Sequence, residues 1–248
     1  MPCVEVSPVA ARVLTMSTDL SLPETTDADL SGADLRDVLA DPPDRPRVFT
    51  RCDMTEANLS DADLVGAVFH DCRLDGARLE RALLEGARFT GGSAAGAVFA
   101  HTECTDARFE RVDLANTRWQ GALLTDTAFT GCRMTGAGLN SLRGIGYTFD
   151  HCNLMLARCK GITLRGQTLE GLRMDEADLA SADLRDTVWV DSRLRGANLV
   201  NVRLGGADLR GADLGEPTLE QAGYLRGASI GFAQAGTILA ALGITVMD

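Results

Sequence analysis

Each of the three histidines in the chain lies close in sequence to a cysteine, and histidine with cysteine is a ligand combination that binds zinc. The pairs are His70 with Cys72, His101 with Cys104, and His151 with Cys152. A zinc site needs ligands that converge on one ion, so the direction of each side chain decides whether a pair could contribute. That direction depends on the backbone conformation, which a repeat in the sequence predicts.

The chain follows a repeat of five residues. From Phe49 to Leu219 every fifth residue is large and apolar with few exceptions, and only Ala94 and Gly144 clearly break the rule. This register runs for 35 repeats without an inserted or deleted residue, and the residue two positions before each centre is almost always small. A period of five fits neither a helix nor a single strand, so the chain must turn once in each repeat. The sequence therefore predicts an all-β solenoid of short strands.

Turn-forming residues separate the successive inward-facing pairs. The second turn position is often Gly, Asn or Asp, which tolerate a positive φ, as at Gly66, Gly76 and Asn116. The coils of such a solenoid stack through parallel backbone hydrogen bonds. In this register the histidines point outward and the cysteines point inward, so one ion could not easily bridge a pair. We therefore predict no metal site, no cofactor and no catalytic residues, since the histidines also fall in separate coils.

The motif Ala-Asp/Asn-Leu-x-Gly recurs, whole or in part, along the chain. It stands at residues 28–32, 33–35, 57–59, 177–179, 197–199 and 207–211. With this motif the chain resembles the pentapeptide-repeat proteins over most of its length. The resemblance implies a right-handed quadrilateral parallel β-helix, in which four successive repeats make one coil of twenty residues.

The aromatic residues test this expectation, because a coil of four repeats would place every fourth centre in one column. Six of the eight phenylalanines share a single phase. They are Phe49, Phe69, Phe89, Phe109, Phe129 and Phe149. We predict that their rings form a stacked core ladder inside one wall of the solenoid, here named the phenylalanine wall.

The cysteines follow the same phase. Four of them share the small inward position of the next wall, here named the cysteine wall, and two more take central positions, whereas Cys3 lies outside the repeat. These six are Cys52, Cys72, Cys132 and Cys152, and then Cys104 and Cys159. Thiols that pack as small apolar groups suit a reducing compartment, so we expect a cytoplasmic protein. We see neither a signal peptide nor a membrane span in the sequence.

The repeat divides the chain into three parts. Residues 1–26 lack it and form an N-terminal extension, residues 27–219 form the β-helix, and residues 220–248 form a C-terminal module. Three prolines interrupt the repeat and predict a loop at 40–47. A short helix ended by a glycine is expected within 231–243, where it would cap the last hydrophobic coil and block its open strand edges.

The C-terminal module is also a candidate for dimerisation, because the family that the chain resembles has helical C-terminal dimer modules. We therefore expect a homodimer joined through the C-terminus. The candidate contact residues are the apolar residues of the helix and tail, namely Phe232, Ala235, Ile238, Leu239, Leu242, Ile244 and Val246.

The outward-facing charges differ between the two remaining walls. On the wall that contains Leu64 and Leu84, here named the acidic wall, no basic residue precedes Arg143. Its outward acids, here named the acidic strip, are Asp63, Glu85, Glu103, Asp106 and Asp126. The wall that contains Leu59 and Leu79, here named the basic wall, carries Arg78, Arg81, Arg118, Arg158 and Lys160. The whole chain has a net charge of −11, and the acidic strip is the candidate contact for a partner.

The resemblance to pentapeptide-repeat proteins also suggests a function. The quinolone-resistance members, of the Qnr and MfpA types, are understood as mimics of duplex DNA that bind DNA gyrase or topoisomerase IV. A rod of ~41 Å, expected from coils ~4.8 Å apart, resembles a segment of duplex in length and width. We therefore expect a DNA mimic that binds DNA gyrase or topoisomerase IV, protects it from a poison and does not itself contact nucleic acid. The alternative is a scaffold that binds another protein along one wall, whereas an enzyme is disfavoured because a filled core leaves no cleft.

Overall fold

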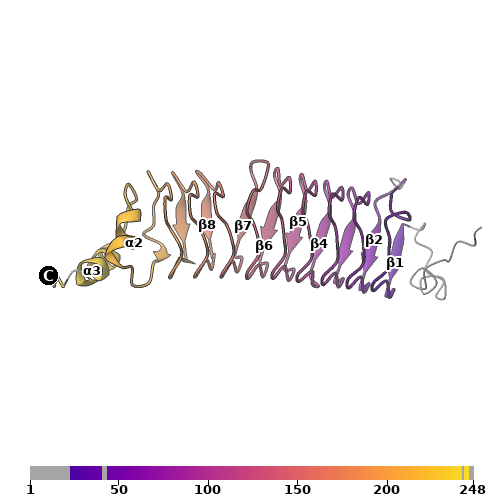
Figure 1. Ribbon diagram of the computed structural model, residues 1–248, viewed down its shortest axis with the longest axis horizontal. Coiled ribbons are helices and arrows are strands. Elements are labelled where there is room, and N and C mark those ends of the chain that lie inside the picture. The colour runs from indigo at the N-terminus through magenta and orange to yellow at the C-terminus, as the bar shows by residue number, and fades with distance from the viewer. Residues whose placement is uncertain (1–22, 41–43, 242, 246–248) are drawn as a thin grey trace, which may run out of the picture.

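The computed structural model describes residues 23–40, 44–241 and 243–245 of the 248-residue chain (Figure 1). These residues form a long rod of short strands that ends in two helices near the C-terminus. The strands are β1 (Glu24–Thr26), β2 (Val48–Thr50), β3 (Val68–His70), β4 (Arg88–Thr90), β5 (Arg108–Glu110), β6 (Ala128–Thr130), β7 (Thr148–Asp150), β8 (Thr168–Glu170), β9 (Val188–Val190), β10 (Ser192–Arg193) and β11 (Ala212–Asp213). The helices are α2 (Leu219–Tyr224) and α3 (Phe232–Ala241).

The rod is a parallel β-solenoid of about 9 turns, which confirms the predicted fold class. Strands β1 to β7 form one parallel sheet along the phenylalanine wall, and each strand from β2 to β6 pairs with the strand twenty residues later, as Phe49 does with Phe69. Bridges with the same spacing run along the cysteine, basic and acidic walls, for example between Asn58 and Arg78. Four pentapeptides therefore complete one coil.

The corners of the coils are tight turns. At one of them the Ala77 N–H donates to the Leu74 carbonyl at 3.0 Å, and Gly76 between them has a φ of 66°. Asn116 takes the same corner position with a φ of 56°. Because the backbone is left-handed at these corners, Gly and Asn fit where a β-branched side chain would be strained. This requirement explains why turn formers recur with the period of five.

An aromatic core fills the middle of the rod. Neighbouring rings of the phenylalanine ladder have centroids 4.4 to 5.1 Å apart and interplanar angles of 3° to 19°. On the opposite wall Phe99 and Trp119 stack at 4.1 Å and meet the ladder edge to face. Both arrangements are favourable for aromatic rings. Ala94 is buried in the same coil as Phe99, so the larger ring supplies volume that the alanine leaves.

The solenoid begins earlier than the predicted boundary between residues 26 and 27. Strand β1 pairs with β2 and sets Thr25, which is 7% exposed, against Phe49. The sequence did not predict this strand because Thr25 occupies the inward position at which later coils have a phenylalanine. Partners in this first coil are 24 residues apart, and the extra residues fall in the predicted loop at 40–47. Residues 1–22 of the predicted N-terminal extension, including Cys3, and residues 41–43 of the predicted loop lie outside the described residues.

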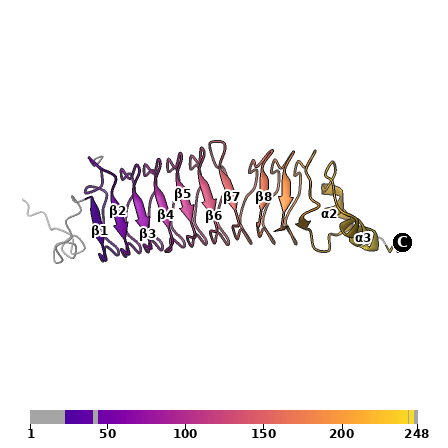
Figure 2. The ribbon, with the colours of Figure 1, turned by 180° about the vertical axis from the view of Figure 1, so that it is seen from behind.

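The strand ladder opens at one level, although the spacing of twenty residues continues through it. Asn153 and Arg173 remain bridged on the cysteine wall, but β7 and β8, both within the described range 44–241, do not pair with each other and belong to separate sheets (Figure 2). The buried Tyr147 lies here, and its hydroxyl accepts a hydrogen bond from the Thr163 N–H at 3.2 Å. The Gln167 side chain donates to the Tyr147 carbonyl at 3.0 Å. A large ring at a normally small inward position thus separates two coils without changing their register.

The regular repeat ends at Leu214, so the prediction that it reaches Leu219 is wrong. Leu219 is 49% exposed and is the first residue of α2. Pro217 removes a backbone donor just before it, and Thr218 and Gln221 form a capping box in which the Thr218 hydroxyl accepts from the Gln221 N–H at 3.3 Å. These local signals favour a helix and override the apolar residue at the fifth position.

The segment after α2 closes the open end of the core. Leu225 is 8% exposed, and the Ser229 N–H donates to the Ala207 carbonyl at 2.8 Å, which adds a last rung to the ladder. Helix α3 lies within the predicted range 231–243, and Gln234 Nε2 donates to the Leu209 and Ala212 carbonyls at 2.8 and 2.6 Å. The helical region therefore covers the last coil and satisfies backbone acceptors at its edge.

Candidate protein-interaction surface

The acidic strip extends over four successive coils of the acidic wall. Asp63 and Glu103 share one outward column two coils apart, and Glu85 projects from the coil between them. Asp106 and Asp126 occupy successive corners with φ of 58° and 53°. Because coils are ~4.8 Å apart, the three steps from the first to the last coil of the strip span about 14 Å along the rod.

Four of the five carboxylates of the strip, all except that of Asp63, have no partner among the residues that the structure describes. Among the described residues these four make no ion pair and no side-chain hydrogen bond, and all four are exposed. Asp63 is half-buried, and its carboxylate accepts a hydrogen bond from the Val65 N–H at 3.2 Å. Arg108 of the phenylalanine wall donates to the main-chain carbonyl of Asp126 at 2.7 Å rather than to its carboxylate. A partner could therefore bind these charges without breaking an internal ion pair.

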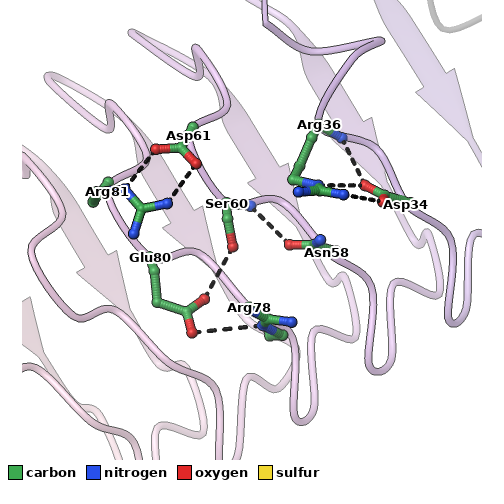
Figure 3. Close-up of polar contacts among 8 residues, drawn as sticks. All are labelled: Asp34, Arg36, Asn58, Ser60, Asp61, Arg78, Glu80 and Arg81. Atoms are coloured by element: carbon green, nitrogen blue, oxygen red, sulfur yellow. Dashed lines mark hydrogen bonds and ion pairs between the residues drawn. The ribbon is translucent and has the colours of Figure 1, made fainter.

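The first coils of the basic wall show the opposite arrangement. Figure 3 shows Arg81 reaching back one coil to bind both carboxylate oxygens of Asp61, at 2.7 and 2.6 Å. This contact lowers the pKa of Asp61, chiefly through the hydrogen bond from Arg81. Glu80 also has two partners, since one oxygen lies 3.5 Å from Arg78 and the other accepts from the Ser60 hydroxyl at 3.1 Å. The charges here are largely compensated within the wall.

Toward the C-terminal end of the acidic wall, the acidic side chains form ion pairs with arginines. The Asp183 side chain is 7% exposed and lies between Arg185 and Arg203, at 2.8 and 2.9 Å. The hydrogen bond from Arg185 lowers the pKa of Asp183 to about 2. Arg165 pairs with Asp186 at 3.1 Å in the same region. Among the described residues, the uncompensated negative charge of this wall is therefore concentrated in the acidic strip.

A spacing of twenty residues accounts for several of the ion pairs between coils, and the period of five alone did not reveal it. An arginine twenty residues after an aspartate stands directly over it in the next coil, as Arg81 does over Asp61 and Arg133 over Asp113. No acid of the strip has a basic residue twenty positions before or after it. The amino-acid sequence therefore shows that no coil above or below the strip places a basic residue directly over one of its acids.

The candidate dimer residues differ in exposure. Phe232 is 92% exposed and Ile244 is 49% exposed, whereas Ile238 is half-buried and packs against the core. The remaining candidates are Ala235 and Leu239, which are half-buried, and Leu242 and Val246, which lie outside the described residues. Phe232 and Ile244 are thus the described apolar side chains that a second subunit could cover most fully.

The histidines and cysteines of the three close pairs face different environments. His70 is exposed, whereas Cys72 is 2% exposed and its thiol donates to the Phe49 carbonyl at 3.3 Å. Burial raises the pKa of the Cys104 and Cys159 thiols to about 12, so both are protonated and unreactive at neutral pH. In the described part of the chain, no group of three or more His, Cys, Asp or Glu side chains could hold a metal ion.

Two family models match the chain. A model of the pentapeptide repeat region matches residues 48–119, and a model of eight pentapeptide repeats matches residues 102–140 and 177–215. Together they span more than half of the chain. No protein of curated function matches the chain in sequence. None of the helices in the described residues is long and apolar enough to cross a bilayer.

Solved structures share the fold. Full-length QnrB1, a plasmid-mediated fluoroquinolone resistance protein, is 16% identical over 89% of this chain and 100% of that chain, with a TM-score of 0.62. A trypsin-treated QnrB1 variant is 18% identical over 81% of this chain and 99% of that chain, with a TM-score of 0.56. At these identities the likeness concerns the fold alone. From the two family models and the solenoid they describe, the chain belongs to the pentapeptide-repeat proteins, which are generally structural or adaptor proteins.

Proposed function

We propose that this protein binds a type II topoisomerase, DNA gyrase or topoisomerase IV, as a mimic of duplex DNA, and protects the enzyme from a poison. Such protection would serve antibiotic resistance or immunity against a toxin of the producing cell. The observation that carries the proposal is the acidic strip on one wall of the rod, where four of the five carboxylates have no ion pair or hydrogen bond within the described part of the chain. The fold shared with a fluoroquinolone resistance protein supports the same function.

The acidic strip has the charge density of one DNA strand rather than of a duplex. It places five carboxylates within about 14 Å of rod length. One strand of B-DNA carries about four phosphates over that length, and both strands carry about eight. We infer that the strip takes the place of one phosphate backbone in the basic DNA-binding groove of the enzyme, and that the width of the rod supplies the rest of the contact.

The overall charge favours the enzyme over DNA as the partner. With a net charge of −11 the chain is repelled by the polyanionic duplex and attracted to a basic groove. Complementary potentials of this kind mainly accelerate association and orient the partners. We propose that the protein acts in the cytoplasm, a reducing compartment in which its buried thiols persist.

A homodimer joined through α3 would lengthen the rod and present two acidic strips. The exposed Phe232 and Ile244 lie at and just beyond the ends of α3, at the C-terminal end of the solenoid. In a two-fold symmetric dimer these apolar side chains would cover the same surface on each subunit. The acidic strips lie closer to the other end of each rod, so they would stay accessible.

The test is DNA supercoiling by purified gyrase with increasing amounts of the protein, with and without a quinolone. The expected result is rescue from the quinolone, with direct inhibition at higher dose. A strip variant, Glu103→Lys with Asp106→Lys, should lose both effects. The matched control is Glu170→Lys with Glu176→Lys, which changes the net charge equally at exposed acids outside the strip that have no ion pair among the described residues.

The outcomes separate the proposed function from its alternative. If the strip variant acts like the wild type while both remain folded, the strip is not the contact. If the wild type has no effect in either arm, the topoisomerase proposal fails. The protein would then be a scaffold that binds another protein along one wall, and its partner would be sought by affinity capture.

A further inference from the structure

Two exposed arginines on the basic wall flank a glycine. Arg118, Gly138 and Arg158 follow one another in one outward column, joined by parallel bridges. Among the described residues neither arginine makes an ion pair, and both are exposed. A shallow depression of about 460 Å³ lies over Gly138, here named the Gly138 notch. Its remaining lining residues are Gln120, Asn140 and Ser141.

The position of Gly138 is one that an acid occupies elsewhere in the solenoid. On the cysteine wall Arg133 stands at the same position of its repeat as Arg158, and it pairs with Asp113 one coil earlier. The residue one coil before Arg158 is Gly138, which has no carboxylate. A Cβ added to Gly138 would lie 3.4 Å from Arg158 Nη2, so this guanidinium already extends over the place of the missing acid.

The Gly138 notch presents hydrogen-bond donors and no carboxylate. The Asn140 side-chain oxygen accepts a hydrogen bond from the Lys160 backbone N–H at 3.2 Å, which leaves the amide NH₂ group as a donor. Lys160 is exposed two residues after Arg158, outside the lining of the notch. Asp178, the next residue of the column after Arg158, accepts a hydrogen bond from the Asn198 side chain at 2.9 Å and forms no ion pair with Arg158. In a chain with a net charge of −11, the two arginines therefore give the notch a local positive potential that favours an anion.

We propose that the Gly138 notch binds a phosphate group, which takes the place of the aspartate absent at position 138. A guanidinium presents paired N–H donors that match phosphate oxygens, and Arg118 and Arg158 supply two of them on opposite sides of the notch. A phosphate dianion is attracted by the two guanidinium groups more strongly than a single carboxylate is. Arg118 and Arg158 are two coils apart, or ~10 Å, which suits one phosphate or a diphosphate rather than a nucleic acid strand. The phosphate is either inorganic or part of a nucleotide.

The test is a titration of ¹⁵N-labelled full-length protein at constant ionic strength, with inorganic phosphate and ADP as separate probes and backbone amides followed by NMR. Saturable shifts centred on Gly138, Gln120 and Asn140 are expected. Comparable binding of both probes assigns the site to phosphate itself, and tighter binding of ADP assigns it to a nucleotide. The variant Gly138→Asp supplies the missing carboxylate internally, and its affinity should fall about tenfold or more. The backbone of Gly138 is not left-handed, so aspartate is compatible with the fold.

Two further variants keep the result interpretable. Arg158→Gln should weaken binding without adding an acid, whereas Arg88→Gln, at an exposed arginine of the phenylalanine wall, should bind like the wild type. Melting curves check that each variant is folded. Shifts that fail to saturate, undiminished binding by a folded Gly138→Asp, or saturation by citrate without saturation by phosphate would overturn the proposal.

Discussion

Replacing Phe109 with alanine removes a ring from the middle of the aromatic core. Phe109 is fully buried, and its ring stacks on Phe89 at 4.6 Å and on Phe129 at 4.9 Å. It also meets Phe99 and Trp119 edge to face, at 6.0 and 5.5 Å. The alanine would leave a cavity between coils whose backbones are fixed by ladders on four walls, so the site cannot collapse to fill it.

The expected cost follows from these contacts. Truncating a buried phenylalanine to alanine lowers the free energy of unfolding by about 3–5 kcal/mol. Each aromatic pair adds about 0.5–1.5 kcal/mol beyond the buried area, so four ring neighbours put the cost for Phe109 at the upper end of the range, about 5 kcal/mol. Phe49 is the matched control, because among the described residues its ring has one aromatic neighbour, Phe69 at 5.1 Å. We expect Phe49→Ala to cost about 3 kcal/mol.

The assay is urea unfolding of the wild type and both variants, followed by circular dichroism. The urea concentration at the midpoint of unfolding should fall more for Phe109→Ala than for Phe49→Ala. The slope of the unfolding free energy against urea should stay unchanged, because equal slopes indicate that equal surface is exposed on unfolding. An unchanged midpoint for Phe109→Ala, or equal loss in the two variants, would refute the inference that the stacked and edge-to-face contacts stabilise the middle of the rod.

Three further predictions concern the surface and the ends of the rod. Reversing Glu103 and Asp106 to lysine should raise the Kd for gyrase about tenfold or more and weaken its dependence on salt, as measured by surface plasmon resonance, and an unchanged Kd would contradict this. Deleting residues 231–248 should give monomers by light scattering, and a persistent dimer would place the interface elsewhere. The Arg185 contact holds the folded-state pKa of Asp183 at about 2, below its unfolded value of about 3.9, so its stabilising effect is present above pH ~4 and is lost as the pH falls toward 2. Asp183→Asn should therefore lower the Tm at pH 7 but not near pH 2, and an equal difference at both pH values would argue against the ion pair.

The period of five was enough to predict the solenoid, because each coil contacts mainly its two neighbours and these repeat the same pattern. The shared phase of Phe49 and the five phenylalanines after it also predicted which residues stand over one another. The members of the acidic strip could be named for the same reason, since their outward direction depends only on their position in the repeat. The absence of a basic residue twenty positions before or after each of them was equally present in the sequence.

The sequence by itself therefore determined the coil, its walls and the direction of each side chain within the repeat. Only the tertiary structure decided the conformation at the two ends of the solenoid and at the positions where the repeat is irregular. Thr25 belongs to the first coil because β1 pairs with β2. Leu219 lies outside the last coil because a capping box at Thr218 starts helix α2 at this residue. Tyr147 opens the ladder between β7 and β8, while Gly138 leaves Arg158 without the acid that its repeat position has elsewhere. The physical reason is that periodic positions are specified by their equivalents one coil away, whereas ends and interruptions are settled by competing hydrogen bonds and packing that no period contains.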